Sequence, residues 1–219
     1  MKIEGIKINF LGDSITEGHG VSDIQSYRYD NVLSLKYGVI ANNYGIGGSR
    51  LAHQRTASEC PRADLCFCGR AYDMDSSADV IVVYGGVNDY LHGDAPIGND
   101  GDKTPATFKG GVRFLMSTLP ELYPHAKIVF MTPARCVGCL APSSAPIKQS
   151  DAMPLKAYVD IIKNTAKECG IPVLDLYDGL GIDPNLPEDL EKYAPDGLHF
   201  NDVGHAVLAQ KLAEFLMEL

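Results

Sequence analysis

The sequence has 219 residues, of which 45% are hydrophobic and 21% are charged, a composition typical of a soluble globular protein. Its 28 acidic and 19 basic side chains give a formal net charge of −9, and without a dense Lys/Arg cluster we expect no nucleic-acid partner. No apolar stretch is long enough to span a bilayer, and the N-terminus lacks the apolar segment of a signal peptide, so we expect a cytoplasmic protein with no membrane partner unless a leader has been removed.

Five short apolar segments are typical of β-strands. They are residues 6–11, 39–44, 79–84, 127–132 and 172–177. The third and fourth are continuously apolar, as expected of parallel strands that are covered on both faces. Lys7 and Asn9 interrupt the first segment, which fits a central parallel strand less well.

Longer amphipathic segments alternate with these strands. Apolar side chains recur with a helical period over 108–122, 155–169 and 202–218, and Asn201 or Asp202 can cap the last of these helices. Strands that alternate with helices predict an α/β fold with parallel strands and helices on both faces. We expect a single domain over residues 1–219, with its ligand site at the carboxyl ends of the strands.

Four glycine-rich or polar clusters fall at that edge of the predicted sheet. Three follow the first three strands and the fourth precedes the last helix, and they read GDSITEG (12–18), NYGIGGS (43–49), GGVNDY (85–90) and PDGLHFND (195–202). Because parallel strands end at the same edge, the fold is expected to bring all four clusters together.

Ser14 in the first cluster has three interpretations. A phosphate-binding loop would need a lysine, which GDSITEG lacks. Ser14 and Glu17 have the spacing of a helix capping box. The nucleophile elbow of α/β-hydrolases needs glycine two residues after the serine, where this chain has Thr16. If Ser14 is a nucleophile, it therefore belongs to another scaffold.

A serine nucleophile needs a base that is held in the correct tautomer. Asp196 precedes His199 by three residues, which lets the carboxylate accept a hydrogen bond from Nδ1–H and leaves Nε2 to face Ser14. The alternative is that Asp196 caps a turn and His199 is a surface residue. Three other histidines rank below His199 as candidate bases: His19, His92 and His205.

An acyl-transfer site also needs donors for the developing oxyanion. Candidates are the backbone N–H of Ser14, a glycine N–H in the second cluster, and the side-chain amide of Asn88. Gly48 lets its N–H approach a substrate without a Cβ in the way. Asn88 could equally be a turn residue, and we expect Asp13 to hold its loop by accepting backbone N–H groups.

Together the four clusters resemble those of the SGNH-hydrolase superfamily, also called GDSL-like esterases. The resemblance spans residues 10–205, and the matching segments within it are GDSITEG, NYGIGG, GGVND and DGLHFNDVGH. The first departs from the family pattern by reading GDSI in place of GDSL. The resemblance implies a flavodoxin-like three-layer α/β/α sandwich with a five-stranded, mostly parallel sheet.

The same resemblance implies roles for individual residues. Ser14 would be the nucleophile and first oxyanion donor, with Gly48 and Asn88 as the other two donors. His199 would be the base and Asp196 its partner. We expect neither a cofactor nor a metal.

The predicted activity is hydrolysis of a small acyl ester, acetyl on a soluble alcohol such as a sugar. The loops after the second and third strands are long and polar, and they do not look like the apolar groove that a long acyl chain needs. The alternatives are a lysophospholipase or acyl-thioesterase of the same fold, and a non-catalytic binding module. A metallophosphoesterase is disfavoured because the GVNDY segment lacks an Asn-His-Asp run.

The chain has six cysteines, which we expect to be reduced. One hypothesis places two groups of them together in a lid that binds zinc or forms a crosslink, the first group being Cys60, Cys66 and Cys68, and the second Cys136 and Cys139. Unlinked thiols are the alternative, because C-x-C is not a usual zinc spacing.

Overall fold

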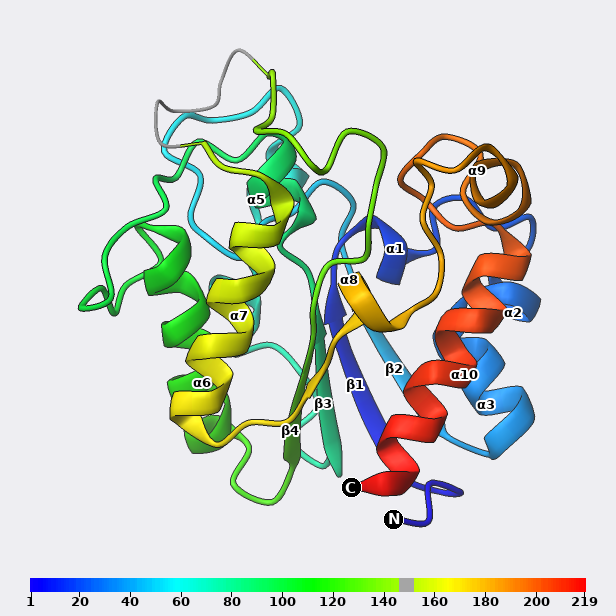
Figure 1. The fold of residues 1–219 in the computed structure, drawn as a ribbon. Helices are drawn as coiled ribbons and strands as arrows, with labels where there is room; N and C mark the ends of the chain where they lie inside the picture. The colour runs from blue at the N-terminus through cyan, green and yellow to red at the C-terminus, as the bar shows by residue number, and fades with distance from the viewer. Residues whose placement is uncertain (146–151) are drawn as a thin grey trace.

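The computed structural model describes residues 1–145 and 152–219. Its centre is a five-stranded sheet with the order β2-β1-β3-β4-β5 (Figure 1). The strands are β1 (Lys7–Gly12), β2 (Ile40–Gly45), β3 (Val80–Tyr84), β4 (Lys127–Met131) and β5 (Val173–Leu174). All four pairings are parallel, which confirms the predicted α/β class and the flavodoxin-like strand order.

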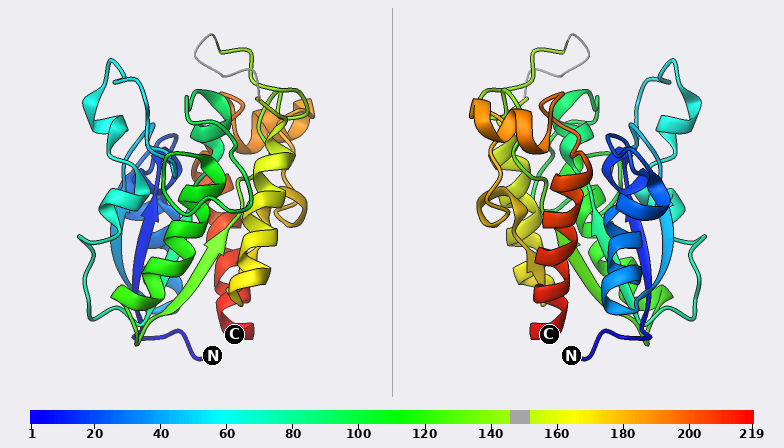
Figure 2. Two further views of the ribbon diagram at one scale, coloured as in Figure 1. Left: turned by 90° about the vertical axis from the view of Figure 1, so that its left-hand side faces the viewer. Right: turned by 90° about the vertical axis from the view of Figure 1, so that its right-hand side faces the viewer.

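Helices cover both faces of this sheet (Figures 1 and 2). One face carries α6 (Phe108–Leu122) and α7 (Leu155–Cys169), and the other carries α3 (Tyr29–Tyr37) and α10 (Asp202–Glu218). Side chains of β3 alternate between the two cores: Ile81 and Val83 belong to the first, and Val80 and Val82 to the second. Burial on both faces explains why this strand is apolar throughout.

Shorter helices connect these layers. They are α1 (Ser14–Glu17), α2 (Ile24–Tyr27), the 3₁₀ helix η1 (Pro61–Asp64), α4 (Phe67–Arg70), α5 (Val87–Leu91), α8 (Leu176–Gly179) and α9 (Pro187–Tyr193). Figure 1 shows α1 and α5 at the end of the sheet opposite the two chain termini. Over the two described ranges, none of the helices is long and apolar enough to cross a bilayer.

The polar residues of β1 are accommodated although the strand is internal. Asn9 is fully buried, and its amide donates to the Asp75 carbonyl at 2.8 Å while its Oδ1 accepts from Asn42 at 3.0 Å. Lys7, at the first position of the strand, pairs with the Asp75 carboxylate at 3.3 Å. A buried amide with both ends bonded adds no unsatisfied polar group to the core.

The fifth strand is shorter than the sequence predicts. In place of residues 172–177, only Val173 and Leu174 are in the sheet. Asp175 ends the strand because its carboxylate accepts from the N–H groups of Tyr177 and Asp178 and begins α8. An N-cap residue therefore stops an edge strand whose composition would have allowed it to continue.

Candidate active site

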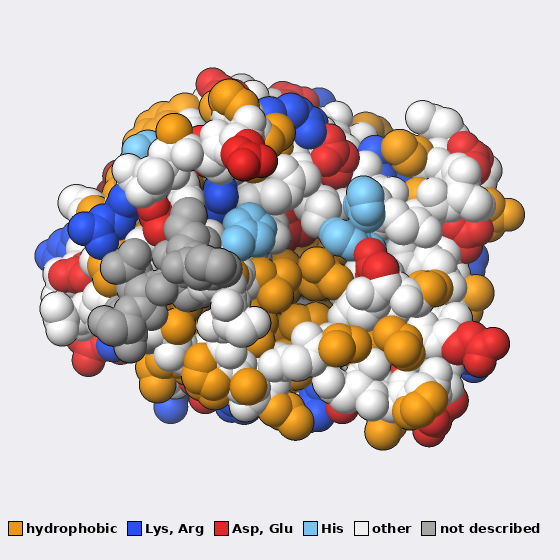
Figure 3. Space-filling view, turned by 90° about the horizontal axis from the view of Figure 1, so that it is seen from above, with side chains coloured by type: hydrophobic (Ala, Val, Ile, Leu, Met, Phe, Trp, Pro, Cys, Tyr) orange, Lys and Arg blue, Asp and Glu red, His pale blue; other side chains and the backbone are white. Residues whose placement is uncertain are grey.

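The four predicted clusters meet at the carboxyl edge of the sheet, around a cleft of about 350 Å³. Its lining comes from all four: Ser14, His19, Gly47, Gly48, Asn88, Leu91, His92, Leu198 and His199. Seen from above, histidine side chains stand on two sides of a hollow, with hydrophobic side chains between them (Figure 3). This placement follows from the parallel sheet, whose strands all end at this edge.

Ser14 is the first residue of α1 and is not its cap. The N-cap is Asp13, whose carboxylate accepts from the Ile15 N–H at 3.1 Å. Glu17 accepts from the Gly47 N–H at 2.7 Å. The capping-box interpretation of Ser14 is therefore wrong, and the expectation that Asp13 holds its own loop agrees with the structure.

The Ser14 hydroxyl is instead paired with an imidazole from the other end of the chain. Its Oγ lies 2.9 Å from Nε2 of His199, 185 residues away in the sequence. Ser14 lines the cleft and is 9% exposed, so most of the residue is covered.

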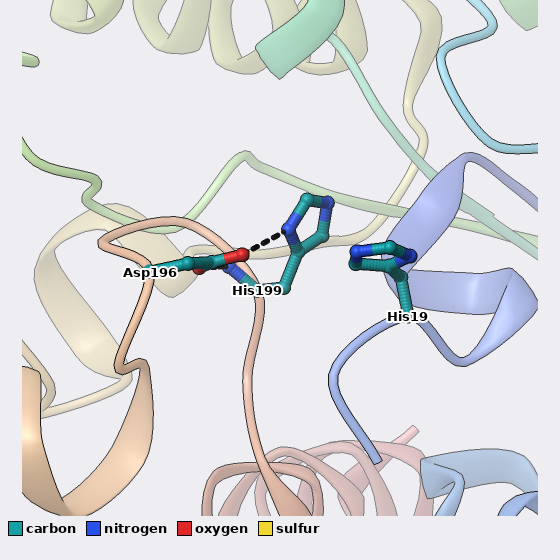
Figure 4. Close-up of side chains that lie close together, drawn as sticks. All are labelled: His19, Asp196 and His199. Atoms are coloured by element: carbon teal, nitrogen blue, oxygen red, sulfur yellow. Dashed lines mark hydrogen bonds and ion pairs between the residues drawn. The ribbon is translucent and has the colours of Figure 1, made fainter.

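Asp196 binds the other ring nitrogen of His199 (Figure 4). His199 Nδ1 lies 2.7 Å from Asp196 Oδ2, and Oδ1 accepts from the backbone N–H groups of His199 and Leu198 at 2.7 and 2.9 Å. Partial burial would raise the pKa of Asp196, but these hydrogen bonds outweigh it and hold the pKa below its usual value. Since the ionised carboxylate accepts from Nδ1–H, the neutral ring has its lone pair on Nε2, facing Ser14.

Sequence spacing alone does not select His199, because Asp89 and Asp202 also precede histidines by three residues. Asp202 accepts from the backbone N–H and hydroxyl of Ser22 at 2.8 and 2.6 Å. His205 is fully buried, and burial lowers its pKa to about 4. We therefore interpret His205 as a neutral structural histidine.

His19 lies against His199, with ring centroids 4.3 Å apart and planes inclined by 56° (Figure 4). With Asp196, the two rings form a group whose potential metal-ligating atoms lie within 4.8 Å of one another. Both nitrogens of His199 are already engaged by Ser14 and Asp196. An ion could use His199 only by displacing one of these hydrogen bonds, so we assign no metal role to the group.

Gly48 and Asn88, the other two predicted oxyanion donors, both line the cleft. Gly48 has φ = +74°, a left-handed conformation that favours glycine. The Asn88 amide nitrogen donates to the Ser49 carbonyl at 3.0 Å. This hydrogen bond connects α5 directly to residues 45–49, which we call the glycine loop.

The residue after Asn88 reinforces this link. Asp89 accepts from the backbone N–H groups of Leu51 and Ala52, both at 2.9 Å. It is 4% exposed, so these hydrogen bonds form away from water. Consecutive side chains of α5 therefore fix the segment that follows Gly48.

Arg70 is a supporting residue that the sequence analysis missed. Its guanidinium donates to the carbonyls of Gly12 and Tyr44 and to the Ser49 hydroxyl, which joins the ends of β1 and β2 to the glycine loop. Burial lowers its pKa to about 10. No local pattern could have indicated this role, because Arg70 lies 58 residues from Gly12 in the sequence.

All six cysteines are free thiols. Cys68 contacts backbone carbonyls of Leu51 and Gly111, whereas Cys139 lies near Tyr177 and Asn185. In the part of the chain that the structure describes, no group of three potential metal ligands includes a cysteine. The hypothesis of a zinc-binding lid finds no support there.

Comparison with known proteins agrees with the geometry. The model of the family described as GDSL-like Lipase/Acylhydrolase matches residues 10–207, a range that contains all four clusters. The chain belongs to this family. Among curated proteins, no match was found.

Solved structures extend the likeness of this GDSL-like chain to its whole length. One is 32% identical, with a TM-score of 0.85 over 100% of this chain and 99% of its own. A Lactobacillus plantarum protein is 28% identical, with a TM-score of 0.82 over 99% and 98% of the two chains. A Chitinophaga pinensis protein described as a possible lipase is 22% identical, with a TM-score of 0.65 over 97% and 98%, and this last similarity shows the fold alone.

Beneath the cleft of this GDSL-like protein lies a second carboxyl group. Asp13 directly precedes Ser14 and is 1% exposed. Burial raises its pKa to about 7, with a further contribution from Asp89, while the Ile15 N–H and Arg70 act in the opposite direction. Asp13 therefore binds its proton more tightly in the folded protein than in the unfolded chain.

This difference predicts a pH-dependent effect of Asp13→Asn. Between pH 4 and 7 the folded wild type holds a proton that the unfolded chain has lost, so its free energy of unfolding falls as pH rises through this window. The substituted amide does not titrate and can still accept from the Ile15 N–H. From pH 4 to 7.5 the variant should gain about 1–4 kcal/mol relative to wild type in urea unfolding.

Asp75→Asn is the matched control. Hydrogen bonds from Ser77 lower the pKa of Asp75 to about 2, so this carboxyl is ionised in both folded and unfolded chains over most of the window. Its difference from wild type should stay nearly constant. Equal pH slopes for Asp13→Asn and wild type would contradict the raised pKa.

Proposed function

We propose that this chain is a serine esterase that hydrolyses small acyl esters, with acetyl as the preferred acyl group. The observation that carries the proposal is the continuous hydrogen-bonded chain from Ser14 Oγ through His199 to Asp196. These three residues come from the two ends of the sequence. Backbone N–H groups orient Asp196, Asp196 orients His199, and the chain ends at a cleft wide enough for a small ester.

In the proposed reaction, Ser14 Oγ attacks the ester carbonyl carbon while His199 Nε2 takes the hydroxyl proton. Asp196 stabilises the resulting imidazolium and keeps its tautomer. The tetrahedral intermediate expels the alcohol, which takes the proton from Nε2, and leaves an acyl group on Ser14. A water molecule then attacks the acyl-enzyme with His199 again as base, which releases the acid and restores the hydroxyl.

In the proposed mechanism, three donors stabilise the substrate oxygen as it becomes negative. They are the backbone N–H groups of Ser14 and Gly48 and the Nδ2 group of Asn88. Asn88 Nδ2 has two hydrogens, and its bond to Ser49 uses one, which leaves the other for the oxyanion. Such preorganised donors stabilise the transition state more than the substrate.

The cleft supports a small acyl group. Its apolar side chains, Leu91 and Leu198, stand beside the histidines and glycines that line the rest. Each methylene of a longer chain needs apolar surface to bury, at about 0.8 kcal/mol per CH₂. The polar ring of His19 suits a polar leaving alcohol, and we therefore propose an acetylated soluble alcohol such as a sugar.

Ser14→Ala tests the mechanism. The variant should lose nearly all hydrolysis of p-nitrophenyl acetate and all covalent labelling by an organophosphonate, because the nucleophile is gone. Ser117→Ala, on the exposed surface of α6, should keep both. Undiminished turnover in Ser14→Ala would rule out the proposed mechanism, and absence of turnover in wild type would favour a binding module.

Asn88→Ala tests the oxyanion hole. Removing one donor should lower kcat by roughly 10²–10³-fold with little change in KM, measured by steady-state kinetics on the same ester. Thermal unfolding checks that losing the Ser49 contact has not disrupted the loop. A change in KM with normal kcat would show that Asn88 only binds substrate.

A series of p-nitrophenyl esters tests the acyl group. We expect kcat/KM to be greatest for acetate and to fall steadily by octanoate, because Leu91 and Leu198 are the apolar side chains among the lining residues and the others are polar or glycine. A maximum at eight carbons or longer would favour a lysophospholipase. Faster cleavage of an acetyl thioester than of the oxygen ester would favour an acyl-thioesterase.

A further inference from the structure

We infer that His92 is a positioning residue for Asn88: it holds the side-chain carbonyl of Asn88 so that the amide NH₂ is available to the oxyanion. This inference rests on the proposed function. It concerns which end of the Asn88 amide meets the substrate, a question that the presence of an asparagine does not answer.

The problem is that a primary amide has two opposite ends. Rotation of the side chain by half a turn exchanges the NH₂ donor for a carbonyl acceptor of almost the same shape. At an oxyanion hole, the first orientation stabilises the developing negative charge and the second repels it. The site therefore needs a device that selects one orientation before substrate arrives.

Two contacts of Asn88 select the orientation in which the NH₂ group is the donor. Nδ2 lies 3.0 Å from the Ser49 carbonyl oxygen, which can only accept, so the NH₂ end is fixed on that side. Oδ1 lies 3.1 Å from His92 Nε2. Because an amide oxygen only accepts, Nε2 must carry the hydrogen, as it does in one neutral tautomer and in the imidazolium.

The backbone of α5 keeps the side chains of Asn88 and His92 next to each other. His92 follows the last residue of α5, four residues after Asn88, and its backbone N–H donates to the Asn88 carbonyl at 3.0 Å. The side-chain bond therefore closes a second link between the same two residues. Asn88 is 3% exposed, so solvent cannot readily replace a lost donor to Oδ1.

The Ser49 contact is in turn anchored by its neighbours, since Arg70 donates to the Ser49 hydroxyl and Asp89 binds the backbone N–H groups of Leu51 and Ala52. Ser49 holds the Asn88 amide only through Nδ2. His92 holds it through Oδ1 as well, and the two contacts together prevent the amide group from rotating.

His92 also lines the cleft, so direct contact with substrate is the rival explanation. The two roles differ in kinetics. A residue that acts through Asn88 alters kcat and loses its effect when Asn88 is replaced, whereas a residue that binds substrate alters KM and acts independently of Asn88.

The experiment compares His92→Phe and His92→Gln on p-nitrophenyl acetate, in wild-type and Asn88→Ala backgrounds. Phe fills the ring volume without a donor, and Gln supplies a donating NH₂. His92→Phe should lower kcat about 10-fold with KM unchanged, and His92→Gln should recover most of that loss. In the Asn88→Ala background, His92→Phe should cause no further loss.

His19→Ala is the matched control, because His19 lines the same cleft and the inference gives it no role in orienting Asn88. The factor by which His19→Ala changes kcat should be the same in the wild-type and Asn88→Ala backgrounds. An equal loss from His92→Phe with and without Asn88, a change confined to KM, or no loss at all would each overturn the inference.

A second measurement separates this inference from the proposed function. Nitrogen-15 NMR of the imidazole in the wild-type protein should show a hydrogen on Nε2 of His92, whether or not the ring is charged. That result requires no turnover, so it stands even if the ester series fails. A neutral ring protonated on Nδ1 would overturn the inference whatever the enzyme hydrolyses.

Discussion

Parallel pairing of β1 with both β2 and β3 sets the level at which three loops leave the sheet. Gly12 at the end of β1 is in register with Gly45 on one side and Tyr84 on the other. The loops that carry Ser14, Gly48 and Asn88 therefore begin at the same level of the sheet, at the ends of three adjacent strands. Strand order reverses between β1 and β3, so their connections run to opposite faces and leave a crevice between them. The contacts between these loops, Glu17 with Gly47 and Asn88 with Ser49, depend on this register.

Two carboxyl groups near Ser14 show how position decides their chemistry. Asp13 is enclosed by the fold, and burial raises its pKa to about 7. Asp196 stands at the rim of the cleft, where His199 and two backbone N–H groups keep its pKa low despite partial burial. The first carboxyl supports the turn that presents Ser14. The second remains ionised, as the proposed stabilisation of an imidazolium requires.

The helix α5 contributes more to the site than its length suggests. Asp89 holds the chain beyond Gly48, while Asn88 holds Ser49 and is itself held by His92. Two proposed oxyanion donors from different strands are thereby kept at a fixed separation. Together with the hydrogen bonds that Arg70 donates, these contacts preorganise the cleft.

Local sequence patterns were sufficient to predict the strand–helix alternation, the parallel sheet and the edge at which the four clusters meet. They also singled out Ser14, Gly48, Asn88, Asp196 and His199 as site residues, whose roles remain a proposal. The reason is that strand periodicity, glycine-rich turns and the end of a strand are properties of a few neighbouring residues.

Tertiary structure decided the rest. It showed that Asp13 caps α1 and leaves the Ser14 hydroxyl for His199, and it separated His199 from His205, which also follows an aspartate by three residues. It ended β5 at Leu174 and brought Arg70 and His92 into contact with the site. These outcomes depend on which polar atoms meet across long stretches of chain and on how deeply each is buried, and the spacing of residues along the sequence contains neither.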